Sequence, residues 1–89
     1  MANPAHEALL RQGLEDWNLW RRQNRSVVPD LEGLQMSAAN LRGADFSHAL
    51  LSGATLIRAR LERCDLRHAD LRNAQLHEAD FTDADLFRA

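Results

Sequence analysis

The chain has 89 residues with 11 Arg, no Lys and 13 Asp or Glu, which gives a formal net charge of −2. Such a short chain forms one small domain without a large internal cavity, and its mild charge provides no general attraction to nucleic acid or anionic membranes. No apolar run approaches the ~18 residues of a membrane span, and the single Cys64 excludes an internal disulfide and favours a cytoplasmic protein.

Residues 4–23 are predicted to form a helix. Asn3 is a suitable N-cap, Pro4 suits the first helical position and Glu7 suits the first turn. Gly13 weakens this helix by roughly 1 kcal/mol relative to Ala unless close packing requires it. One face of the helix is apolar and consists of Leu9, Leu10, Gly13, Leu14, Trp17 and Trp20.

A five-residue repeat follows and fills the rest of the chain. A large apolar residue recurs at Leu31, Met36, Leu41, Phe46, Leu51, Leu56, Leu61, Leu66, Leu71, Leu76, Phe81 and Leu86. Two positions before each lies a mostly small residue: Pro29, Leu34, Ala39, Ala44, Ala49, Ala54, Ala59, Cys64, Ala69, Ala74, Ala79 and Ala84. This period matches neither the three-and-four spacing of an amphipathic helix nor the alternation of a single strand.

The repeat predicts an all-β solenoid. A large and a small apolar residue two positions apart point to the same side of an extended segment, and the polar residue between them points outward. The next two residues must turn the chain, because another inward pair follows at once. Extended pieces joined by corners wind into coils, whose stacking buries a continuous core. We therefore expect a helical cap and linker over residues 1–28 and a solenoid over residues 29–89.

Segments 39–43 (ANLRG), 44–48 (ADFSH) and 69–73 (ADLRN) resemble the A-(D/N)-(L/F)-X-X unit of pentapeptide repeat proteins. The resemblance implies a right-handed quadrilateral parallel β-helix with four pentapeptides per coil, so the twelve repeats would form three coils. The chain departs from the unit at Pro29, Leu34, Leu50, Thr55, Arg60 and Cys64. We expect these departures to alter the local surface and not the fold.

A coil of four pentapeptides places residues 20 apart directly above one another, about 4.8 Å apart. This register stacks opposite charges in four pairs: Arg42 with Glu62, Arg58 with Glu78, Arg60 with Asp80, and Arg63 with Asp83. Each such pair contributes roughly 0.2–1 kcal/mol. The same register also stacks the like charges of Asp45, Asp65 and Asp85 in one column.

Two interpretations of the leading helix remain open. The exposed end of a solenoid core needs a cover, and only a short linker separates the helix from the first coil. We therefore favour a cap whose contacts are made by Leu10, Leu14, Trp17 and Trp20. The alternative is an amphipathic helix that binds a peptide or a membrane surface.

Few residues are candidates for catalysis or metal binding. Cys64 is at an inward position and His68 at an outward corner, so we do not expect them to form an activated nucleophile. His48 and His68 should stack one coil apart, but the chain has no compact Cys/His metal motif, and we expect a solvated pair. We therefore expect no enzyme activity, no cofactor and no metal.

The function we expect is a non-catalytic protein-interaction or scaffold module with an unidentified protein partner. The resemblance implies an alternative, because some pentapeptide repeat proteins resemble B-form DNA, bind type II topoisomerases and protect them from quinolones. Three coils would be roughly 14 Å tall against about 34 Å for one DNA turn. The Asp column would carry one charge per ~4.8 Å against one per ~1.7 Å of duplex. We therefore favour the interaction module, with no direct binding to membranes or nucleic acid.

The last coil is predicted to leave its strand edges and the end of the core uncovered, which favours association. Either the chain is a fragment of a longer solenoid, or it dimerises end to end as a two-fold pair. For the dimer we expect contacts at Leu76, Phe81, Leu86 and Phe87.

Overall fold

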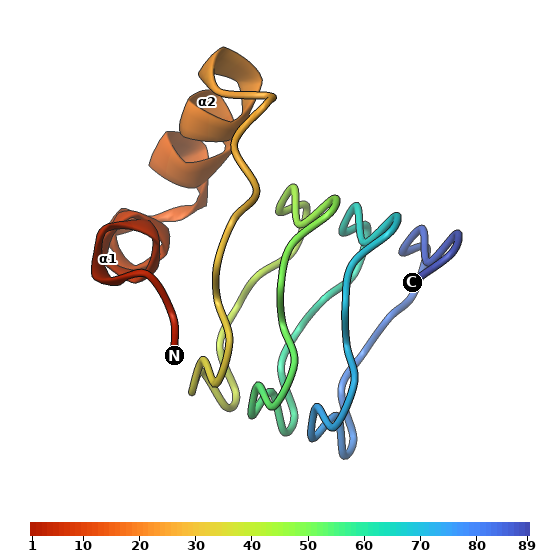
Figure 1. Cartoon of the computed structure of the whole chain (residues 1–89). Coiled ribbons are helices and arrows are strands. Elements are labelled where there is room, and N and C mark those ends of the chain that lie inside the picture. Colours follow the sequence, from red (N-terminus) through yellow and green to blue (C-terminus); the bar gives the residue numbers. More distant parts are fainter.

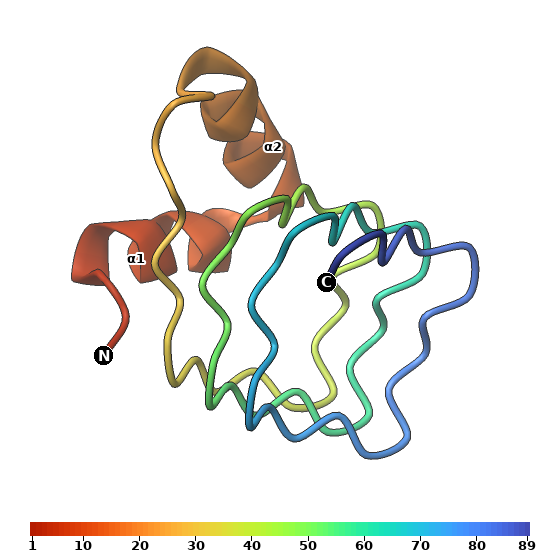
Figure 2. The ribbon, with the colours of Figure 1, turned by 45° about the vertical axis from the view of Figure 1, so that its right-hand side comes forward.

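The computed structural model describes all 89 residues, as two short helices followed by a stack of coils (Figure 1). Helix α1 spans Pro4–Gln12 and helix α2 spans Leu14–Gln23. Both helices lie at the end of the stack where the first coil begins, and the C-terminus lies at the opposite end (Figures 1 and 2). Neither helix is long and apolar enough to cross a membrane.

The expectation of one continuous helix over residues 4–23 is wrong, because the helix breaks at Gly13. Its start is as predicted: the side chain of Asn3 accepts a hydrogen bond from the N–H of Ala5 at 2.9 Å, and Pro4 occupies the first position. Gly13 has φ 133° and ψ 159°, a conformation that residues with a Cβ rarely adopt. The glycine therefore ends α1 and lets α2 leave in a different direction (Figure 2).

Every pentapeptide makes the same tight turn directly after its large residue. The carbonyl of the large residue accepts a hydrogen bond from the N–H three residues later, as between Leu41 and Ala44 at 3.2 Å. The third residue of each turn has φ between 58° and 75°, which is the requirement of a type II turn. Only Gly33, Gly43 and Gly53 adopt this φ freely; at the other nine turns it costs on the order of 1–2 kcal/mol.

Parallel pairing between residues 20 apart joins one coil to the next, in the register predicted from the sequence. The bridges include Asp45 with Asp65 and Leu50 with Asp70. Each bridge rests on two backbone bonds: the N–H of Leu51 donates to Asp70 at 2.8 Å, and the N–H of Asp70 donates to Ala49 at 2.9 Å. The expected parallel strands are not present, because two of every five residues turn and leave only a single bridging residue on each face.

The core is a column of large side chains beside a column of alanines. Residues of both columns from Leu41 in the first coil to Ala69 at the start of the last coil are at most 3% exposed. Leu10 and Trp17 of the helices belong to the same buried cluster. In the last coil, Leu71, Leu76 and Phe81 are only half-buried. The core is therefore closed at the helical end and open at the other.

Candidate interaction surfaces

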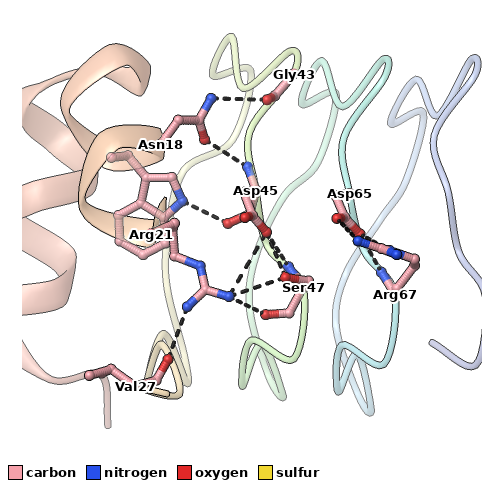
Figure 3. A network of polar contacts seen from close by, with 9 residues as sticks. Asn18, Arg21, Val27, Gly43, Asp45, Ser47, Asp65 and Arg67 are labelled. Carbon is pink, nitrogen blue, oxygen red and sulfur yellow. Dashed lines mark hydrogen bonds and ion pairs between the residues drawn. The ribbon is translucent and has the colours of Figure 1, made fainter. Parts of the chain in front are cut away.

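Side chains of α2 supply hydrogen-bond partners to part of the first coil (Figure 3). In the second coil, the N–H of Asp65 donates to Ala44 at 3.0 Å and its carbonyl accepts from Phe46 at 2.8 Å. The equivalent Asp45 has no coil before it. Instead, Trp17 Nε1 donates to the carbonyl of Asp45 at 2.9 Å, and Asn18 Oδ1 accepts from its N–H at 2.8 Å. Trp17 and Asn18 thus replace one rung of a preceding coil.

Helix α1 and its N-cap complete a second rung in the same way. The N–H of Asp30 donates to His6 Nδ1 at 3.0 Å, and its carbonyl accepts from the N–H of Asn3 at 3.0 Å. Arg11 Nη2 donates to the carbonyl of Gln35 at 3.1 Å. The apolar pattern of the sequence could not identify these polar contacts, because it marks which face is buried and not which backbone groups need partners.

Arg21 joins α2, the linker and the first coil, although it is only 5% exposed. Its Nη1 donates to the carbonyl of Val27 at 2.9 Å, and its Nη2 donates to the carbonyl of Ser47 at 2.7 Å. Asp45 Oδ1 lies 3.9 Å from Nη2, while the Nε atom is buried without a hydrogen-bond partner. Burial lowers the pKa of Arg21, although the charges of Asp45 and Asp65 act to raise it.

The structure brings the four predicted cap residues together on the core. Leu10 and Trp17 are buried, and Leu14 and Trp20 are half-buried against the same cluster. The ring of Trp17 lies 5.3 Å from that of Trp20 and 5.9 Å from that of Phe46 in the first coil. The apolar face of the helices is therefore occupied by the solenoid.

The four residues predicted at the open end do not form one surface. Leu76, Phe81 and Leu86 are at inward positions of the last coil, where Leu86 is 43% exposed. Phe87, 58% exposed, is at an outer corner, with its ring edge-on to His68 at 5.8 Å. Phe87 therefore belongs to the side of the solenoid and not to its end.

Backbone groups of the last coil lack the partners that the preceding coil has. The N–H groups of Leu51, Leu56 and Leu61 donate to residues 70, 75 and 80 of the next coil, all at 2.8 Å. The corresponding N–H groups, those of Leu71, Leu76 and Phe81, make no hydrogen bond. The carbonyls of Ala69, Ala74 and Ala79 are also without partners. This edge, which we call the open edge, therefore presents donors and acceptors together.

Two of the four predicted charge pairs form ion pairs. Arg42 lies 3.8 Å from Glu62, and Arg58 lies 3.3 Å from Glu78. Arg60 instead lies 3.7 Å from Glu62, two residues along the same coil, and not with Asp80. Neither Arg63 nor Asp83 forms an ion pair. Arg60 pairs with Glu62 because the two residues lie two positions apart in the same pentapeptide, within reach of each other.

Arginines two residues away neutralise part of the acidic surface. Arg67 donates to Asp65 through Nε at 2.8 Å and Nη2 at 2.6 Å, and Arg72 binds Asp70 in the same way. The hydrogen bond from each arginine side chain lowers the pKa of its aspartate. The Asp-x-Arg spacing is the sequence signal for these pairs, which the stacking of charges between coils does not predict.

Two polar hollows lie on the sides of the solenoid. The first, of about 490 Å³, is lined by Arg42, Gly43, Glu62, Arg63, Thr82 and Asp83. The second, of about 250 Å³, which we call the basic hollow, is lined by Arg21, Arg25, Asp45, Ser47, His48, Arg67 and His68. The His48 and His68 rings stack within it, 4.8 Å apart and 13° from parallel.

Cys64 and the histidines do not form a catalytic or metal-binding cluster. Cys64 is buried in the alanine column, where its thiol donates to the carbonyl of Leu41 at 2.9 Å. Burial raises the pKa of this thiol to about 11, so it is protonated at neutral pH. No group of three or more His, Cys, Asp or Glu side chains is placed to hold a metal ion.

Comparison with known families gives one match. The family model for pentapeptide repeats matches residues 30–56 and 49–88, with eight copies of the repeat. The matched region contains all of the parallel bridges and none of α1 or α2. No curated protein and no solved structure gives a significant match.

Proposed function

The chain belongs to the pentapeptide repeat family, and on that premise we propose that it is a non-catalytic protein-interaction or scaffold module. The proposed module has the fold that the repeats imply, a right-handed quadrilateral β-helix of three coils. The family is consistent with such a role, and the buried, protonated Cys64 suits the reducing cytoplasm. The observation that carries the proposal is the open edge.

The open edge is suited to pairing with another backbone. Unpaired N–H and C=O groups in a row are a template for a further strand. The edge also carries apolar surface, since Leu76 and Phe81 are half-buried and Leu86 is 43% exposed. Association at this edge would therefore satisfy backbone groups and bury apolar area together.

For the 89-residue chain, a second copy is the partner that we propose for this edge; in a longer solenoid, a further coil would cover the same edge. Because donors of Leu71 and Leu76 alternate with acceptors of Ala69 and Ala74, the edge is complementary to itself. A self-complementary surface favours a two-fold pair, the commonest closed arrangement of protein subunits. Phe87 is not part of this proposed contact, because its ring packs on His68 at the side.

The DNA-mimic alternative has less support. Arg67 neutralises Asp65, the middle member of the Asp45, Asp65 and Asp85 column, and Arg72 neutralises Asp70 outside that column, so the acidic column is not a continuous row of free charges. The longest extent of the molecule, 31 Å including the helices, is shorter than one turn of DNA at about 34 Å.

Light scattering across a concentration series tests the interaction module. We expect a reversible dimer that Leu86→Arg converts to a monomer, because the new charge would be buried at the contact. Leu19→Arg is the matched control, since Leu19 is 45% exposed on α2, far from the open edge. A monomer at every concentration, or equal effects of both substitutions, would contradict the proposed partner.

A further inference from the structure

The basic hollow concentrates positive charge in a chain whose net charge is −2. Two arginines that line it, Arg21 and Arg25, together with two histidines, stand against the single carboxylate of Asp45, while the third arginine, Arg67, is paired with Asp65 at 2.6 Å. The first hollow differs, because its Arg42 and Arg63 are balanced by Glu62 and Asp83. The excess of positive charge is therefore a property of the basic hollow and not of the solenoid as a whole.

The one carboxylate in the basic hollow is already partly engaged. Asp45 Oδ1 accepts hydrogen bonds from the N–H of Ser47 at 3.0 Å and from its hydroxyl at 2.6 Å (Figure 3). Arg21 lies 3.9 Å from it, at the limit of an ion pair. Both hydrogen bonds from Ser47 fall on Oδ1, and Oδ2 accepts none, so this carboxylate is only partly engaged and, with Arg21 at 3.9 Å, compensates its basic neighbours only in part.

Two cations at this corner remain under-compensated. Arg25 makes no hydrogen bond and no ion pair. Arg21 is 95% buried, yet its Nε has no partner, and burial lowers its pKa in spite of Asp45 and Asp65. A buried donor without an acceptor is costly, and an anion in the hollow would supply both an acceptor and a countercharge.

We propose that the basic hollow binds a phosphate-sized, doubly charged oxyanion, held by Arg21, Arg25 and the stacked imidazoles of His48 and His68. Its volume of about 250 Å³ is below the ~300–1,000 Å³ of pockets for drug-sized ligands. The hollow therefore suits a single phosphate group, either free or at the end of a larger molecule that extends into solvent.

The stacked rings of His48 and His68 add ring N–H donors to the hollow beside its arginines. The charged and aromatic groups around the two histidines are Arg21, Arg25, Asp45, Asp65, Arg67, Asp85, Phe87 and Arg88.

Titration of isotope-labelled protein with inorganic phosphate, followed by NMR at constant ionic strength, tests the site. We expect saturable shifts at Ser47, His48 and His68, with a dissociation constant on the order of millimolar, as suits a single small anion. Arg25→Gln should weaken binding about tenfold, since it removes one charged hydrogen bond. Arg63→Gln is the matched control, because it removes the same charge from the other hollow and should leave binding unchanged.

Sulfate is a second probe, because it shares the tetrahedral shape and the double charge of phosphate, and we expect it to give the same saturable shifts. The same shifts in equivalent chloride, or equal weakening by both Arg variants, would overturn the proposal.

Discussion

The indole Nε1 of Trp17 donates a hydrogen bond to the carbonyl oxygen of Asp45 at 2.9 Å, where the inner coils place a backbone N–H of the preceding coil. A side chain of the helical segment thus takes over a position in the backbone ladder of the solenoid. The contact serves two purposes, since the same indole is fully buried over Phe46.

Trp17→Phe separates the hydrogen bond from the apolar packing. The substitution keeps most of the ring but leaves the Asp45 carbonyl without its donor, so we expect a loss of about 1–3 kcal/mol in the free energy of unfolding. Trp20→Phe is the control, because the indole of Trp20 is half-buried and donates no hydrogen bond. Urea denaturation followed by circular dichroism measures both, and equal losses would mean that packing alone accounts for the role of Trp17.

The contrast between Trp17 and Asn18 shows what the sequence could predict. A period of five residues determines the turn and the buried columns, because each repeat must present the same inward pair, whereas the register of 20 residues is what the resemblance to pentapeptide repeat proteins implies. Trp17 was predicted to face the core because it continues the apolar stripe of the helix. Asn18 carried no such signal, since its role comes from the unpaired N–H of Asp45, a consequence of tertiary structure. The break at Gly13 was likewise missed, because a helix interior tolerates one glycine at modest cost.

Gly53→Ala tests the energy of the positive-φ turns. A Cβ at Gly53 meets no atom within 4 Å, so the only cost is the backbone conformation at φ 70°. We expect the free energy of unfolding to fall by about 1 kcal/mol. The reverse change, Arg63→Gly at φ 60°, should relieve the same strain and raise stability by about 0.5 kcal/mol, part of the gain being offset by unfolded-state entropy. Thermal melts of both variants measure the effect, and a loss of stability in both would contradict this account.

Acid should destabilise the fold through its Asp–Arg pairs. The hydrogen bond from Arg67 holds the pKa of Asp65 below its ordinary value of 3.8. The pair therefore contributes stability above that value, and the contribution is lost as the pH falls through the lower pKa of the folded state. We expect the melting temperature of the wild type to fall between about pH 4 and pH 2, and to fall less in Asp65→Asn.

Asp83→Asn is the matched control for the acid experiment. Asp83 is an exposed carboxylate in the last coil that forms no ion pair, so its removal should leave the slope of the melting temperature with pH as in the wild type. If Asp65→Asn gave the wild-type slope as well, the Asp65–Arg67 pair would contribute nothing to the stability of the folded state.

A DNA supercoiling assay with a type II topoisomerase separates the interaction module from a DNA mimic. Mimicry needs a long, dense row of free negative charge, at one charge per ~1.7 Å of duplex. Here Arg67 binds Asp65 in the second coil at 2.6 Å, and Arg72 binds Asp70 in the last coil at 2.7 Å. We therefore expect a large excess of the protein neither to inhibit supercoiling nor to protect the enzyme from a quinolone.

The variant with both Arg67→Gln and Arg72→Gln sharpens this experiment, because it frees Asp65 and Asp70 without adding any carboxylate. The net charge falls from −2 to −4, yet the solenoid remains shorter than one turn of DNA. If length limits mimicry, this variant should also be inactive, whereas activity in the variant alone would show that the arginines are what prevents it. Robust protection by the wild-type protein at micromolar concentration would refute the charge-density argument and favour the DNA mimic over the interaction module.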